Sequence, residues 1–363
     1  MKKVFCKMAL ASVLALTTLF TGCKAPSSGG GSAYNPPEKN IPLTLEAIAD
    51  GQITFDNLDR IINLKYRIND GEVIAATDTG ISLPAGDKIS LFAEGTLNGN
   101  NTNQCFTINC SSDCYVYGNV MSLLTDDYQN ETTITQENAF RNLFNSNTYI
   151  KNHPEKEIVL PATSLTKSCY QAMFWNCTSL TAAPILPSKK LSSACYGNMF
   201  FGCTSLTKAP SLPATTLEGS CYNGMFWNCT SLTAAPVLPA TSLAEDCYGF
   251  MFKGCTSLTK TPSLPVTTLE ASCYFAMFSG CTSLTKAPVL PATTLAPSCY
   301  CDMFDGCTSL NKVTCLATDL SATDCTTSWL SGVASSGTFT KASGADWSSG
   351  ASGIPSGWTI KNK

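Results

Sequence analysis

The chain has 363 residues, with 26 acidic and 23 basic side chains and a formal net charge of −3 at pH 7. Only 13% of the residues are charged, which argues against a nucleic-acid-binding protein, because such proteins concentrate basic residues on one face. The hydrophobic content of 44% is ample for globular structure, and the length predicts two or three domains.

Residues 1–22 are predicted to be a lipoprotein signal peptide. A basic start is followed by an apolar run at residues 8–20, which is shorter than the roughly 20 residues that span a bilayer. The run ends in Leu19-Phe20-Thr21-Gly22-Cys23, which resembles the lipobox of bacterial lipoproteins. The resemblance implies that Cys23 is lipidated and anchors the chain stably if it carries two or more acyl chains. The alternative is an ordinary secretory peptide in which Cys23 has no role.

Residues 23–40 are rich in Ser, Gly and Pro and are expected to form a flexible tether behind the lipid. Residues 41–137 show alternating hydrophobicity and are predicted to form a small β-sandwich domain. A hairpin is expected around Asn69-Asp70-Gly71, because Asp-Gly tolerates the positive φ of a tight turn. Further strands are expected at residues 81–83, 88–92 and 114–118.

A unit of 26 residues recurs without insertion through the second half of the chain. One cysteine column comprises Cys169, Cys195, Cys221, Cys247, Cys273, Cys299 and Cys325, and the other comprises Cys177, Cys203, Cys229, Cys255, Cys281 and Cys307. Such a period predicts a solenoid in which each unit is buried only against its neighbours. The array is placed at residues 138–330, with a degenerate first copy and a half-copy at the end. Residues 331–363 are predicted to be a β-hairpin cap.

One unit, residues 203–228, is predicted to contain a short strand and a short helix. Pro210 and Pro213 confine any strand to about residues 206–209, since proline cannot donate to a β-ladder. Cys221, Tyr222, Met225 and Phe226 have the spacing of one stripe on a two-turn helix. The fold class expected is therefore α+β, a leucine-rich-repeat solenoid preceded by the β-sandwich.

The consensus Cys-x-x-Leu-x-x-Ala-Pro-x-Leu-Pro-Ala-Thr-x-Leu, followed by Cys-Tyr-x-x-Met-Phe-x-x-Cys, resembles the BspA-like (Treponema-type) leucine-rich repeat family. The resemblance covers residues 138–330, where the loop with Pro-Ala-Thr makes the unit slightly longer than is usual in that family. It implies a surface protein of oral or gut anaerobes with an adhesin role and no enzymatic activity.

The two cysteine columns admit three interpretations: buried thiols, disulfides or a metal site. The predicted helix holds the two cysteines of one unit too far apart to bond, and packing between helices does the same along the first column. The second column, spaced like neighbouring strands, would permit disulfides. Only one histidine, His153, is present, and the array has no Cys-x-x-Cys pair, so zinc and other metals are not expected. The cysteines outside the columns are better disulfide candidates: Cys105, Cys110, Cys114, Cys301 and Cys315.

Two variable columns are candidate ligand surfaces. One column carries Trp175, Phe201 and Trp227 and then turns polar at Lys253, Ser279 and Asp305. The other carries Lys208, Lys260, Lys286 and Lys312. The alternatives are that the rings pack against neighbouring parts of the protein and that the lysines are a solvated row that discourages aggregation.

The sequence thus predicts a lipid-anchored envelope protein, on the outer membrane and surface-exposed, that binds a host or bacterial surface protein. The alternatives are a glycan-binding module of a nutrient-uptake system, with the sugar held by the β-sandwich, or a structural envelope protein. No catalytic residues, no cofactor and no nucleic-acid partner are expected, and the membrane contact is expected through the N-terminal lipid alone.

Overall fold

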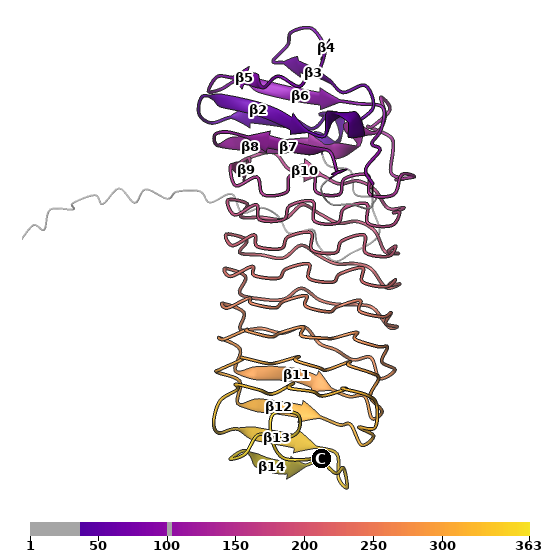
Figure 1. Cartoon of the computed structure of the whole chain (residues 1–363), viewed down its shortest axis with the longest axis vertical. Helices are drawn as coiled ribbons and strands as arrows, with labels where there is room; N and C mark the ends of the chain where they lie inside the picture. The colour runs from indigo at the N-terminus through magenta and orange to yellow at the C-terminus, as the bar shows by residue number, and fades with distance from the viewer. Residues whose placement is uncertain (1–36, 100–103) are drawn as a thin grey trace, which may run out of the picture. The chain divides into compact units, whose positions relative to one another are not determined.

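The computed structural model describes residues 37–99 and 104–363, and residues 35–363 form one compact unit. The signal peptide, Cys23 and most of the predicted tether lie outside the described residues. Within the described ranges, regular structure is mostly β-strand, and the helical segments are the short 3-10 turns η1 (Pro37–Asn40), η2 (Leu58–Arg60) and η4 (Val120–Leu123). Figure 1 shows coils stacked one below another between the N-terminal sheets and the C-terminal strands.

The N-terminal region contains two sheets that contribute to a shared hydrophobic core. The first has the order β10-β8-β1-β6-β3-β4, with β9 also paired to β8, and the second has the order β5-β2-β7. The N-terminal strands of this region are β1 (Thr44–Ala47), β2 (Gly51–Asp56), β3 (Lys65–Ile68), β4 (Ile74–Ala75), β5 (Ile81–Leu83), β6 (Lys88–Phe92), β7 (Thr107–Cys110) and β8 (Cys114–Asn119). The hairpin predicted at residues 69–71 is present, since β3 and β4 pair antiparallel across it.

The array is built directly onto the N-terminal sheets. In the first coil, β9 (Ile150–Asn152) and β10 (Ile158–Val159) both pair parallel with β8. On the other side of that coil, the backbone N–H of Ile108 in β7 donates to the carbonyl of Leu143. The degenerate copy therefore packs against the two sheets on one face and against the second coil on the other, where Phe140 N–H donates to the carbonyl of Cys169.

The segment predicted to be a helix in each unit is instead a series of turns. In the unit at residues 203–228, positive φ angles recur every fourth residue, at Ser220 (55°), Gly224 (59°) and Asn228 (58°). Between them, N–H groups alternate in direction: Tyr222 donates to Cys247 in the next coil, whereas Met225 donates to Tyr222 three residues back. We call residues 220–229 and their equivalents the turn side, and the remainder of each coil the strand side.

The prediction of a helix is wrong because four-residue turn units produce nearly the same pattern of buried residues. Cys221, Met225 and Cys229 follow one another at intervals of four, a period that an α-helix of 3.6 residues per turn does not keep. A position with a left-handed backbone conformation favours Gly or Asn. The column of Asn228 accordingly carries only these two residue types: Asn176, Gly202, Asn228, Gly254, Gly280, Gly306 and Gly332.

The interior of the turn side consists of two stacks of aromatic rings. Phenylalanines from Phe144 to Phe304 stack with ring centroids 5.5–5.8 Å apart and planes within 9° of parallel. Tyrosines from Tyr170 to Tyr300 form the second stack, with centroids 5.8–6.2 Å apart. Offset parallel rings at this separation are favourable beyond the area they bury. The hydroxyls of Tyr170 and Tyr196 are buried without a hydrogen-bond partner among the described residues.

All eighteen described cysteines, from Cys105 to Cys325, are buried and none of them forms a disulfide, including the five proposed as disulfide candidates. In the second column each thiol donates to a phenylalanine carbonyl of the preceding coil, as Cys229 does to Phe200 at 3.1 Å and Cys255 to Phe226 at 3.0 Å. Because the segment is not a helix, the helical spacing used to argue against disulfides does not apply. These thiol hydrogen bonds give the column a packing role.

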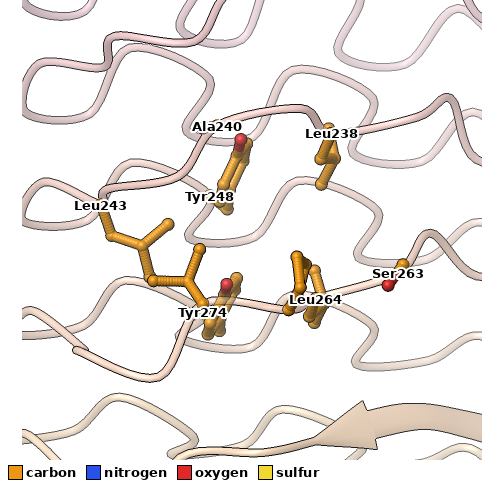
Figure 2. Close-up of a pocket in the computed structure, with 9 residues that line it drawn as sticks. Leu238, Ala240, Leu243, Tyr248, Ser263, Leu264 and Tyr274 are labelled. Atoms are coloured by element: carbon orange, nitrogen blue, oxygen red, sulfur yellow. The ribbon is translucent and has the colours of Figure 1, made fainter.

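The strand side is more loosely connected. Beyond the first coil, with β9 and β10, regular strands are found only toward the C-terminus, as β11 (Lys286–Leu290) and β12 (Lys312–Cys315), while isolated parallel bridges join coils between these regions. Figure 2 shows a seam between two coils where Tyr248 lies over Tyr274 and Leu238 lies near Leu264. This seam has no room for a water molecule and is a packing gap rather than a ligand site.

The predicted C-terminal β-hairpin is wrong. β13 (Thr338–Lys341) pairs parallel with β12, and β14 (Thr359–Asn362) pairs parallel with β13. A parallel pair needs a crossover rather than a tight turn, so residues 331–363 continue the array. Trp329 closes the stacks: it is fully buried, packs on Tyr300 at 6.2 Å and donates from Nε1 to the Gly353 carbonyl.

Candidate ligand-binding surface

Five aromatic rings form a continuous row on the outside of the turn side. We call Trp175, Phe201, Trp227, Phe250 and Phe275 the aromatic stripe. Consecutive ring centroids are separated by 4.0, 5.0, 5.1 and 4.9 Å, and near-parallel contacts alternate with edge contacts. All five rings are partly exposed, unlike the fully buried stacks behind them. The three rings predicted from their common column therefore lie side by side, and their role in binding stays a prediction.

Phe250 and Phe275 were missed by sequence reasoning because they lie in columns that are small or polar in other copies. Phe250 is equivalent to Asn198, Gly224 and Ala276. Aligning the repeat copies would have shown an aromatic residue at a position that is otherwise small or polar, and this is the signal that could have identified Phe250. Phe250 also has φ of 56°, in the left-handed region where a bulky side chain is an outlier.

Lys253 lies over the middle of the stripe. Its Nζ is 4.9 Å from the Trp227 ring centroid and 5.3 Å from that of Phe250, within range of a cation–π interaction. Lys253 replaces an aromatic residue in the column of Trp175, Phe201 and Trp227. Its ammonium group still contacts the aromatic stripe, because it lies against two of the rings.

The four predicted lysines form a separate row on the strand side. Lys208, Lys260, Lys286 and Lys312 are all exposed. Lys286 and Lys312 are register partners in β11 and β12, whereas Lys208 and Lys260 pair with Ala182 and Ala234. The lysines lie on the strand side and the aromatic stripe lies on the turn side. The two candidate surfaces are therefore separate sites.

An open hollow of about 370 Å³ lies at the N-terminal end of the stripe. Trp175 lines it together with residues of the first three coils: Arg141, Asn142, Asn145, Gln171, Ala172 and Asn198. Asn145 donates to the Asn142 side chain at 3.3 Å. The hollow combines one aromatic wall with a polar lining that is rich in amides.

The only histidine belongs to the junction between the first coil and the N-terminal sheet. His153 accepts backbone hydrogen bonds at Nδ1 from Glu155 and Lys156, and burial together with the Lys156 cation lowers its pKa. His153 is therefore neutral at pH 7, and its 3.9 Å contact with Glu46 is not an ion pair at that pH. Tyr117 donates to Glu46 at 3.0 Å. These contacts tie the insertion of the first coil to β1 and β8.

Within residues 37–99 and 104–363, no three His, Cys, Asp or Glu side chains are grouped as metal ligands would be. None of the helices in these ranges is long and apolar enough to cross a bilayer.

Comparison of the chain with protein-family models, with curated proteins and with solved structures finds no match.

Proposed function

We propose that this is a lipid-anchored cell-envelope protein with a leucine-rich-repeat solenoid, and that its aromatic stripe binds a protein on the surface of a host or neighbouring cell. The predicted lipidation of Cys23 and the tether behind it support anchoring to a membrane of the cell envelope, and exposure at the surface of the outer membrane is part of the proposal. The stripe supplies the partner surface, because aromatic residues dominate the energetics of protein interfaces.

Phe250 is the observation that carries this proposal. A non-glycine residue in the left-handed region costs about 1–2 kcal/mol, and the same column holds Gly224 without that cost. Phe250 nevertheless places a partly exposed ring against Trp227, 5.1 Å away. Other residues of this column, such as Asn198 and Ala276, share the left-handed φ, so the repeat sets the backbone and Phe250 adds the exposed ring. An exposed apolar row extended in this way is typical of a binding surface.

The repeat consensus supports the class of protein. Its resemblance to BspA-like repeats agrees with a scaffold whose partner is another macromolecule, and no catalytic activity is proposed for it. The turn side takes the place of the short helix expected in each unit.

The test uses beads coated with the mature chain and applied to an epithelial cell layer. Phe250→Gly removes a stripe ring and relieves the backbone, and we expect adherence to fall about tenfold. Ala276→Gly is the matched control, because Ala276 lies in the same column with φ of 48°. Adherence of the control should be unchanged, and neither variant should melt below the parent.

Trypsin treatment of the cells before the assay should abolish adherence if the partner is a protein. Unchanged adherence of Phe250→Gly, or equal loss in both variants, would contradict the proposal.

A glycan ligand is the second candidate, and the amide-rich hollow beside Trp175 is the observation that favours it.

A further inference from the structure

We propose that the hollow beside Trp175 is a subsite that binds a pyranose residue of a glycan. Its volume of about 370 Å³ lies within the usual range of small-molecule sites. The proposal is independent of a protein partner on the stripe, because only Trp175 belongs to both surfaces.

The lining has the chemistry that a sugar ring requires. Three partly exposed amide side chains, of Asn145, Gln171 and Asn198, supply both donors and acceptors, which suits hydroxyl groups that also donate and accept. Gln171 and Asn198 are partly exposed, and neither side chain has a hydrogen-bond partner among the described residues. They are therefore able to bond a ligand without breaking an internal hydrogen bond.

Trp175 supplies the apolar wall. Its ring is held by Phe201, whose centroid is 4.0 Å away with the planes inclined by only 16°. A fixed indole provides a surface for the C–H face of a pyranose while the amides take its hydroxyls. Immobilising the ring in advance also lowers the entropy lost on binding.

The charges of the lining disfavour other ligand classes. Arg141 is the one ionised side chain among the residues that line the hollow, and no carboxylate is among them. A phosphorylated ligand is normally bound by several cations or backbone N–H groups, and a cationic ligand by carboxylates. A neutral sugar, or one with a single acidic group beside Arg141, fits this arrangement best.

The experiment uses the full mature chain with a panel of methyl glycosides: neutral hexopyranoses, N-acetylhexosamines and uronic acids. We expect saturation-transfer NMR to detect binding of at least one class. The variant Gln171→Ala/Asn198→Gly should lower that affinity about tenfold, because each lost hydrogen bond contributes modestly. Glycine is chosen at Asn198 because its φ is 54°.

Two controls separate this site from the stripe and from loss of fold. Asn311→Ala changes an exposed amide in a late coil and should bind the glycosides like the parent, as should Phe250→Gly. Thermal melts should show that the double variant is folded. If no glycoside of the panel bound, or if the parent and the double variant bound equally well, the proposal of a sugar subsite would be wrong. The proposal for the aromatic stripe would be unaffected.

Discussion

On the turn side at residues 220–229, all ten backbone N–H groups donate a hydrogen bond, alternately to the next coil and to a residue three positions back. On the strand side at residues 236–242, no backbone hydrogen bond to a neighbouring coil is found among the described residues. Pro236 and Pro239 account for part of this difference, since neither has an N–H group. The comparison shows that the repeat is specified mainly by its turn side, while its strand side tolerates prolines and irregular pairing.

The largest expected effect comes from alkaline pH, because both cysteine columns lie on the turn side. Burial raises the pKa of these thiols, to about 12 for Cys169, Cys203 and Cys255, whereas an unfolded thiol ionises near 8.5. The unfolded state therefore loses protons first, and stability that is complete below about pH 8.5 is lost as pH rises toward 12.

At pH 9.5 each fully buried thiol should lower the free energy of unfolding by about 1.4 kcal/mol. Summed over the columns, this loss is comparable to the whole stability of a typical domain, about 5–15 kcal/mol. Urea unfolding in a reductant at pH 7, 8.5 and 9.5 measures the effect. A midpoint that stayed constant across this range would show that the thiols are not buried as described.

The next largest effect is expected for Phe226→Ala, which interrupts a ring stack. Phe226 is fully buried between Phe200 and Phe252, so its loss should cost about 3–5 kcal/mol. Val237→Ala is the strand-side control: Val237 is 79% exposed, and its loss should change stability by no more than about 0.5 kcal/mol. Similar losses in the two variants, measured by urea unfolding, would remove the contrast between the sides.

A smaller effect is expected from Ala214→Val, which tests how tightly the strand side is packed. Ala214 is 1% exposed, and two added methyl groups should cost about 1–3 kcal/mol through overpacking. Val266 occupies the same column but is only partly buried beside the seam between the two coils, so Val266→Ala should change stability by about 0.5 kcal/mol or less. If Ala214→Val melted like the parent, this column would not be tightly packed.

The smallest effect is expected for Tyr196→Phe. Since the hydroxyl of Tyr196 is buried without a described partner, its removal should leave the free energy of unfolding unchanged or raise it by about 1 kcal/mol. Tyr117→Phe in the N-terminal sheet should instead lose about 1.5–3 kcal/mol, because Tyr117 donates to the Glu46 carboxylate. Chemical denaturation of both variants distinguishes them, and a clear loss at Tyr196 would indicate that its hydroxyl is hydrogen-bonded.

The repeat register and much of the N-terminal region could be predicted from sequence because they depend on local signals. A strict 26-residue period fixed which residues share a column, so the proximity of Trp175, Phe201 and Trp227 followed from it. Asn69-Asp70-Gly71 gave the hairpin between β3 and β4, because the turn chemistry is contained in three residues.

The wrong predictions arose where two kinds of local structure produce the same pattern of apolar residues. A helix and a series of four-residue turns both bury Cys221, Tyr222, Met225 and Phe226. The strict four-residue spacing and the recurrent Gly or Asn before the second cysteine column distinguish them. The strands β1, β2 and β7 were missed, and the parallel pairing of β13 with β14 is set by long-range contacts with β12. The amide-rich hollow could not be predicted because it joins residues of three different coils.

Hydrogen exchange followed by mass spectrometry tests the contrast between the two sides most directly. Peptides that cover residues 220–229 and 236–242 come from neighbouring parts of the array, so they share its global stability and differ in local hydrogen bonding. We predict that amides at 220–229 exchange much more slowly than those at 236–242, with the same contrast between residues 246–255 and 262–268 in the next coil. Equal exchange rates for the two peptides, or faster exchange at 220–229, would contradict the conclusion that the turn side holds the coils together.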